Sequence, residues 1–189
     1  MHDPAAATDD MLLAAAARGD EAAFARLLER HGKRALAVAT RFLGSASDAE
    51  EVVQEAFWRV WSTAGRWRPG EAAFPTWLHR VVVNLCIDRE RRAKLRRFFS
   101  LEAVPEPAEE AAPADRQVEA AGELAQVMAD IRRLPGKQRA ALLLAASGEH
   151  SNQAIATMLG VSEKAVESLL VRARRSLRSE ARRRLGEEQ

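Results

Sequence analysis

The stretch that decides the fold lies near the C-terminus and reads SNQAIATMLGVSEKAVESLLVRARR over residues 151–175. Gly160 can adopt the positive φ that ends a helix, and Ser162 is a favourable N-cap for a second helix directly after it. Val161 and Val166 have the spacing of a hydrophobic staple, which sets the angle at which the second helix leaves the turn. The stretch therefore predicts a helix-turn-helix.

The second helix of this motif is expected to be amphipathic. Its apolar stripe consists of Val166, Leu169, Leu170, Ala173 and Leu177. The residues left on its other faces are Lys164, Glu167, Ser168, Arg172 and Arg175. Because the second helix of such a motif reads the major groove, the pattern indicates DNA binding rather than small-molecule chemistry.

The composition favours an all-helical protein with a polarised charge. Of 189 residues, 47% are hydrophobic, tyrosine is absent and the net charge is +2. Basic clusters at 89–97 and 172–184 flank a segment at 102–115 that carries acidic residues and no basic one. A single cluster would be explained by helix-dipole complementation and solubility. Two clusters, one of them on a helix-turn-helix, favour two contacts with a polyanion.

Several functional classes find no support in the chain. Cys86 is the only cysteine, which excludes an intramolecular disulfide and a Cys-rich metal site. The four histidines lack metal-ligand spacing, and there is no Gly-rich phosphate loop. The acidic N-terminus does not suit a signal peptide, and no apolar run approaches the ~18 residues of a membrane span. We therefore expect a cytoplasmic protein that is not an enzyme and uses no cofactor or metal.

The fold expected from these patterns is all-α, with two helical domains joined by a flexible acidic linker. We expect a disordered N-terminus at 1–9, a helical domain at 10–99, the linker at 100–115, and the helix-turn-helix domain at 116–185. Three prolines in the linker preclude a regular helix there, and its carboxylates keep it solvated.

Within the N-terminal domain, capping residues predict where the helices begin. A short helix is expected over 10–18, and Asp20 caps a long helix with an apolar stripe that includes Leu28. Asp48 is expected to N-cap the next helix, with Glu51 three residues on completing a capping box. Pro75 stands at a first helical position and opens a further helix.

Three blocks of the chain resemble extracytoplasmic-function (ECF) sigma factors. The run DAEEVVQEAFWRVW at 48–61 resembles the helix with which that family binds RNA polymerase. The run FPTWLHRVVVNLCIDR at 74–89 resembles their −10-element helix, and the C-terminal helix-turn-helix resembles their −35-reading domain. The blocks occur in the order and spacing of the family and cover nearly all of residues 10–180.

This resemblance implies a polymerase-binding face on the first block. Its residues are Asp48, Glu51, Gln54, Glu55 and Trp58. Acidic side chains there would complement a basic coiled coil of the polymerase clamp and speed docking. An ordinary solvated helix face explains the same charges equally well.

The resemblance also implies a site for the −10 element. Trp67 and Asn84 match the family positions that form a pocket for an unstacked base. The other expected contacts, to phosphate or bases, are His79, Arg80, Arg89 and Arg92. The alternative for Trp67 is a lid over the core, and for Asn84 a polar residue on a helix face without a partner.

The residues implied for the −35 element are Ser162, Lys164, Glu167, Ser168, Arg172, Arg174 and Arg175. Two positions depart from the common pattern, since many relatives carry a basic residue at Glu167 and an arginine at Leu169. Glu167 can accept a hydrogen bond from cytosine N4 but repels phosphate. The −35 sequence is therefore not transferable from the family.

The function implied by the resemblance is transcription initiation, with core RNA polymerase and promoter DNA as partners and an anti-sigma factor as the common regulator. The acidic linker would then follow the RNA path of the polymerase, although a plain tether would have the same composition. Two alternatives remain: a sigma-like decoy that binds an anti-sigma factor without DNA, and an ordinary helix-turn-helix transcription regulator. Run-off transcription with core polymerase separates the three.

Overall fold

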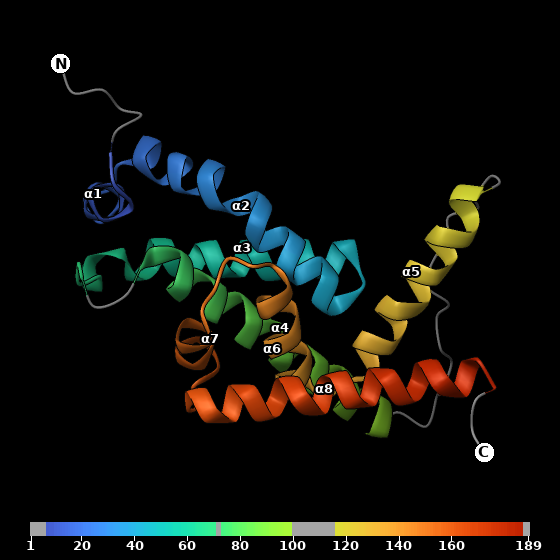
Figure 1. Cartoon of the computed structure of the whole chain (residues 1–189). Coiled ribbons are helices and arrows are strands. Elements are labelled where there is room, and N and C mark those ends of the chain that lie inside the picture. The colour runs from blue at the N-terminus through green and yellow to red at the C-terminus, as the bar shows by residue number, and fades with distance from the viewer. Residues whose placement is uncertain (1–6, 71–72, 100–115, 187–189) are drawn as a thin grey trace.

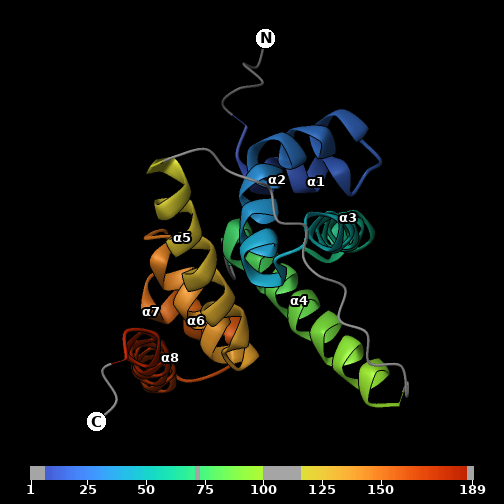
Figure 2. The ribbon, with the colours of Figure 1, turned by 90° about the vertical axis from the view of Figure 1, so that its right-hand side faces the viewer.

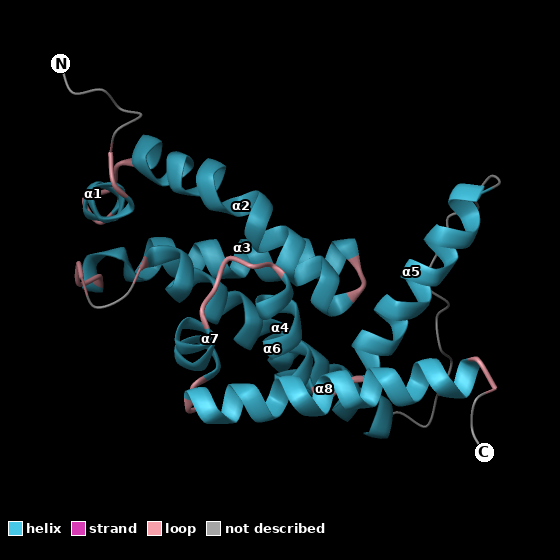
Figure 3. Cartoon of the chain, viewed as in Figure 1, coloured by secondary structure: helices cyan, strands magenta, loops and turns pink. Residues whose placement is uncertain are grey.

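The computed structural model describes residues 7–70, 73–99 and 116–186, and every regular element among them is helical (Figures 1 and 3). A 3-10 turn, η2 (Ala64–Arg66), follows the third helix. The α-helices are α1 (Asp9–Ala16), α2 (Glu21–Leu43), α3 (Ala46–Thr63), α4 (Phe74–Phe99), α5 (Arg116–Arg133), α6 (Gly136–Ala146), α7 (Asn152–Leu159) and α8 (Glu163–Arg184). The predicted all-α class is confirmed. The predicted linker at 100–115 lies outside the described residues.

The helix boundaries follow local capping chemistry, with one correction to the sequence prediction. Asp20 caps α2 as expected, since its Oδ1 accepts a hydrogen bond from the Ala23 N–H at 3.0 Å. The cap of α3 is Ser45 and not Asp48: Ser45 Oγ accepts from the Asp48 N–H at 3.2 Å. Both residue types are good caps, so the earlier serine takes the position. Asp48 lies in the first turn, where its carboxylate complements the helix dipole.

The N-terminal domain is built from α1, α2, α3 and α4. Its core includes Phe42, Phe57, Val60 and Cys86, each no more than 4% exposed. Burial raises the pKa of the Cys86 thiol to about 12, so this cysteine acts as a small core residue. The prediction that Leu28 belongs to the buried stripe was wrong. Leu28 is 43% exposed because α2 buries the face that carries its neighbour Leu27.

The C-terminal domain confirms the predicted helix-turn-helix. Gly160 has φ of 60° and ends α7, and the Ser162 side chain accepts from the Ala165 N–H at the start of α8. Val166, Leu170 and Ala173 are buried against the preceding helices, as the stripe required. Figure 2 shows α5 to α8 grouped on one side of the molecule and α1 to α4 on the other.

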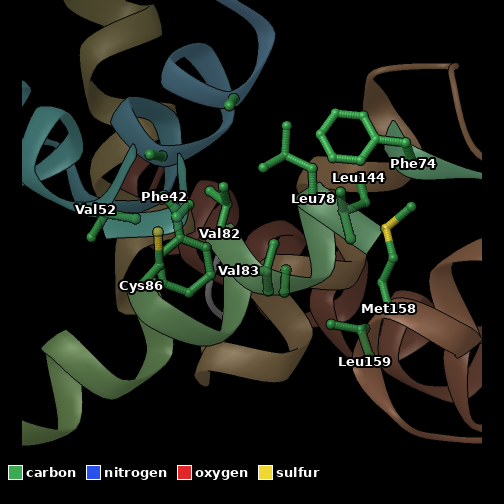
Figure 4. Close-up of a cluster of buried hydrophobic side chains, with 14 of the residues drawn as sticks. Phe42, Val52, Phe74, Leu78, Val82, Val83, Cys86, Leu144, Met158 and Leu159 are labelled. Atoms are coloured by element: carbon green, nitrogen blue, oxygen red, sulfur yellow. The ribbon is translucent and has the colours of Figure 1, made fainter. Parts of the chain in front are cut away.

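The two domains share one hydrophobic core, which the sequence did not predict. Figure 4 shows Leu78 and Val83 of α4 in one cluster with Leu144 of α6 and with Met158 and Leu159 of α7. Burying one such side chain stabilises by roughly 1.5–3 kcal/mol. The packing of α4 against α6 and α7 is therefore a substantial interface rather than a chance contact.

Candidate nucleic-acid interface

The outward face of α8 carries a concentration of positive charge. Val166, Leu170 and Ala173 anchor the opposite face of this helix in the core, so their polar neighbours point to solvent. The exposed predicted residues on or just before α8 are Ser162, Lys164, Glu167, Ser168, Arg172, Arg174 and Arg175. All seven predicted −35 residues thus belong to one accessible segment. Glu167 is the single carboxylate among them.

Two of these residues have local roles that limit their availability. Ser162 Oγ accepts the Ala165 N–H at 3.2 Å, so part of its hydrogen-bonding capacity caps the helix. Ser168 Oγ donates to the Lys164 carbonyl at 3.1 Å. The cationic side chains are consequently better placed to meet phosphate or guanine than the two serines.

Three of the predicted −10 residues form an exposed row on α4. Arg80, Asn84 and Arg92 are exposed and occupy the same side of the helix at intervals of four and eight residues. Asp88 stands exposed between the last two. The row presents an amide between two guanidinium groups, which suits an unstacked base flanked by phosphates.

Trp67 packs against the first turn of α4 and is held mainly by the core. Its indole Nε1–H donates to Asp10 Oδ1 at 2.7 Å. Its ring meets Phe74 and Trp77 edge-on, each with a centroid separation of 5.9 Å. The side chain is half-buried, so these contacts agree with the alternative of a lid over the core while leaving part of the ring accessible.

His79, also predicted to contact the −10 element, is buried in this arrangement. It is 3% exposed, and its Nδ1 lies 2.9 Å from His150 Nε2 in the turn between α6 and α7. Burial, and next the neighbouring His150, lower the pKa of His79 from 6.5 to about 4. The sequence prediction gave His79 as a contact to phosphate or bases, which requires an exposed side chain. The helical spacing of His79, Val82, Val83 and Cys86 indicates the core side.

Arg89 joins the two surfaces that the sequence assigned to different partners. Its guanidinium donates to Glu51 Oε2 at 2.7 Å and to Asp48 Oδ1. The hydrogen bond to Glu51 is the main cause that raises the pKa of Arg89. The predicted −10 residue Arg89 therefore neutralises two predicted polymerase-binding acids, whereas Glu55 of the same face pairs with Arg59 of its own helix.

An apolar groove that the sequence patterns did not predict runs beside this face, between α2 and α3. Its volume is about 890 Å³, and its lining includes Phe24, Leu28, Phe57, Trp58 and Trp61. Trp58 is 64% exposed, although it is the largest type of apolar side chain. An exposed tryptophan next to an exposed leucine marks a surface for a partner.

Other classes of site find no support in the described part of the chain. Its residues hold no cluster of three or more His, Cys, Asp or Glu side chains able to bind a metal ion. Within the same ranges, no helix has the length and hydropathy needed to cross a membrane.

A helical chain with a helix-turn-helix at one end, and with an amide and cations on a second helix, defines a two-domain DNA-binding protein. Comparison with known protein families supports this class with two matches, one in each domain. Residues 27–96 match Sigma-70 region 2, and residues 124–177 match Sigma-70, region 4.

Individual relatives of this chain are RNA polymerase sigma factors. The chain is 39% identical to the ECF RNA polymerase sigma factor SigM of Mycobacterium tuberculosis over 170 residues, which cover 90% of this chain and 83% of SigM. It is 36% identical to the RNA polymerase sigma factor NccH of Alcaligenes xylosoxydans xylosoxydans. The match covers 94% of this chain and 95% of NccH.

Two solved structures share the fold. CnrH, solved in complex with the cytosolic domain of CnrY, has a TM-score of 0.65 at 32% identity, with 92% of this chain and 96% of that chain covered. The sigma factor RpoE, solved in complex with the anti-sigma factor NepR from Bartonella quintana, has a TM-score of 0.61 at 19% identity. The match covers 82% of this chain and 94% of that chain.

The chain belongs to the ECF family of RNA polymerase sigma factors. It is a transcription initiation factor that binds core RNA polymerase and directs promoter-specific initiation through the −35 and −10 elements.

Proposed function

We propose that the chain divides this function among three separate surfaces. The exposed face of α8 reads the −35 element, the row of Arg80, Asn84 and Arg92 on α4 holds the −10 element, and α3 meets core polymerase. The observation that carries the proposal is the burial pattern: each of these helices packs an apolar side into the core and turns its polar side to solvent. The functional domains are residues 10–99 and 116–185, joined by the acidic segment at 100–115.

The polymerase-binding surface in this proposal combines the acidic face of α3 with the apolar groove beside it. Glu55 and Gln54 are exposed, and Trp58 lines the groove. Carboxylates steer a basic partner toward the surface, and an amphipathic helix laid in a groove buries apolar side chains. A basic amphipathic helix of the polymerase clamp fits both properties.

The same groove suits an anti-sigma factor, and we include such a regulator in the proposal. The relative CnrH was solved with a bound cytosolic domain of another protein, CnrY. A protein that covers Trp58 and the acidic face of α3 would compete directly with core polymerase. Because the polymerase works in the bacterial cytoplasm, the initiation factor acts there, and it has no catalytic residue of its own.

Run-off transcription with purified core polymerase tests the proposed division. The intact chain is expected to produce a promoter-specific transcript, and core polymerase alone is not. A decoy would bind an anti-sigma factor without supporting a transcript. An ordinary helix-turn-helix regulator would bind DNA without binding core polymerase. Absence of any promoter-specific transcript across a promoter library would overturn the proposal.

A further inference from the structure

Helix α1 is joined to the loop before α4 through one aromatic side chain. The indole Nε1–H of Trp67 donates to Asp10 Oδ1, in the first turn of α1, at 2.7 Å. A hydrogen bond to an ionised carboxylate is roughly twice as strong as a neutral one. Trp67 directly follows η2, and its backbone N–H donates to the Ala64 carbonyl at 3.1 Å. Both the main chain and the side chain of this loop residue are therefore held by hydrogen bonds.

The indole ring of Trp67 is also held from a second direction, by α4. Its edge-on contacts with Phe74 and Trp77 come from the start of that helix. Phe74 is 2% exposed, so it is a fixed part of the core. These contacts restrict the ring, and the bond to Asp10 selects one of its orientations, because the indole has a single N–H and only one orientation points it at α1.

Asp10 can restrain Trp67 because α1 is itself anchored on α2. Leu12 and Leu13 of α1 are 4% and 1% exposed. Asp9, the neighbour of Asp10, has its Oδ1 at 3.2 Å from the Arg30 guanidinium of α2. The first turn of α1 is therefore fixed by both apolar packing and an ion pair.

The contacts of this first turn close into a circuit. Asp9 Oδ2 lies 2.9 Å from His31 Nε2 on α2, and the His31 ring meets Phe74 edge-on with a centroid separation of 5.1 Å. Phe74 contacts Trp67, which returns to Asp10 beside Asp9. Each member of the circuit is held from two sides. Trp67 is consequently better fixed than a loop residue usually is.

Trp77 links the Trp67 ring to the row on α4 that the proposed function assigns to the −10 element. Arg80 and Asn84 follow Trp77 by three and seven residues, so the three residues share one side of the helix. Seven residues of α-helix are about 10 Å long. Trp67 is half-buried, so the accessible part of its ring lies within reach of the same short strand of DNA.

We propose that Asp10 is a positioning residue for promoter opening, which holds the Trp67 ring in the orientation in which a base of the melted −10 strand stacks on it. This inference rests on the proposed assignment of α4 to the −10 element. Sigma-70 region 2 matches residues 27–96, so α1 lies before the matched segment. Without Asp10 the ring would have to be ordered when the base binds, and that ordering lowers affinity.

The rate of promoter opening by holoenzyme tests this role, on a promoter that the wild-type chain transcribes in the run-off test. Asp10→Ala removes the acceptor, whereas Asp10→Asn keeps an oxygen that accepts the indole N–H. Asp10→Ala is expected to slow opening at least fivefold, the lower end of the loss for one unstacked base. Asp10→Asn is expected to restore the rate to within twofold of wild type.

The direction of the effect distinguishes positioning from simple charge. A carboxylate that only lies near DNA repels phosphate, so its removal would leave opening unchanged or speed it. Glu29→Ala is the matched control, since it removes an exposed carboxylate from α2, and it is expected to leave the rate unchanged. Opening by Asp10→Ala as fast as by Glu29→Ala would overturn the proposal.

The substitution Trp67→Phe tests whether Asp10 acts through the indole, because phenylalanine keeps an aromatic ring without an N–H. In this background Asp10→Ala is expected to change the opening rate less than twofold. An effect as large as in the wild-type background would refute positioning through Trp67. Core affinity of Asp10→Ala is expected to match wild type, since Asp10 does not line the groove on α2 and α3. A loss of core affinity equal to the loss in opening rate would make the role of Asp10 merely structural and overturn the proposal.

Stacking can also be measured directly, without the opening step. The base analogue 2-aminopurine, whose fluorescence is quenched by stacking, replaces each base of the −10 segment in turn in a promoter with a pre-formed bubble. Wild-type and Asp10→Asn holoenzymes are expected to quench one position at least twofold, and Asp10→Ala to lose at least half of that quenching. Equal quenching by Asp10→Ala would count against the proposal. Failure of the proposed function shows separately, as absence of transcript from the wild-type holoenzyme.

Discussion

Mild acid is expected to weaken the packing of the two domains, because the interface holds His79 in its neutral form. The side chain is 3% exposed, and burial, followed by the proximity of His150, lowers its pKa from 6.5 to about 4. The groups that act on it from the surrounding elements are His150 and Glu149 in the α6–α7 turn and His31 and Arg34 on α2. Glu149 alone among them favours the protonated form, and its effect is smaller than that of burial.

The direction and size of the effect follow from the two pKa values. Above pH 6.5 the imidazole is neutral whether it is packed or exposed, so its titration does not change the free energy of the packed state relative to the exposed state. Between pH 6.5 and 4 the exposed imidazole takes up a proton and the packed one does not, so the packed state loses stability as the pH falls. With values of 6.5 and about 4, the loss between pH 7 and pH 5 is about 2 kcal/mol, a factor of roughly 30 in the equilibrium. The limit at lower pH is about 3.4 kcal/mol.

The variant His79→Gln isolates this contribution, because glutamine keeps a hydrogen-bonding side chain but does not titrate. We would measure the free energy of unfolding of both full chains by urea denaturation at pH 7 and at pH 5. The wild-type chain is expected to lose about 2 kcal/mol more than the variant over this interval. Carboxylates titrate in both chains and cancel in the comparison. Equal losses would refute the claim that packing keeps His79 neutral.

The remaining predictions concern the three contact surfaces. Asn84→Ala should lower base discrimination at the −10 element by about 1–3 kcal/mol in promoter-opening assays while core binding survives; unchanged base preference would contradict the assignment. Glu55→Lys should weaken core binding and reduce its salt sensitivity, and undiminished affinity in a titration would count against the acidic face. Arg172→Ala should weaken −35 binding, uniformly across sequences and with a smaller salt slope if it contacts phosphate. Glu167→Arg should change the preferred −35 sequence in a selection from randomised DNA; an identical motif would show that Glu167 does not face the bases.

The choice of Glu55 over its neighbour follows from a contact that the sequence did not reveal. Glu51 accepts a hydrogen bond from Arg89 at 2.7 Å, so Glu51→Lys would place a cation against Arg89 and disturb the packing of α3 on α4. Glu55 pairs at 2.9 Å with Arg59, which is on its own helix. Its reversal therefore changes the charge of the surface with less effect on the fold.

Local signals in the sequence were sufficient for the helices and for the helix-turn-helix. The turn at Gly160 depends on the φ that only glycine adopts without strain, and the Ser162 cap depends on its own hydroxyl and a backbone N–H three residues away. Where two good caps compete within three residues, as Ser45 and Asp48 do, the composition alone does not decide between them. The predicted start of α3 was wrong for that reason.

The contacts that escaped prediction join residues far apart in the chain. The resemblance of residues 74–89 to a −10-element helix predicted His79 as a DNA contact, whereas its partner His150 lies 71 residues further on. The apolar groove escaped for a similar reason, because Leu28 and Trp58 come from different helices. Periodicity within one helix identifies its buried side, but it does not identify which other helix lies against each position.

Arg139 is a further residue whose environment is set by contacts far away in the chain. Nothing in the run GKQRAALLLAA of α6 distinguishes it from a solvated arginine, and only Glu90 and the Phe42 carbonyl explain its burial. Its Nε is buried without a hydrogen-bond partner among the described residues, and an apolar side chain at such a site is often at least as stabilising as an ion pair. An ion pair differs from an apolar contact when the two domains are apart, because water then solvates both partners well. A buried ion pair at the centre of an apolar interface is therefore weaker evidence for tight packing of the two domains than the apolar contacts around it.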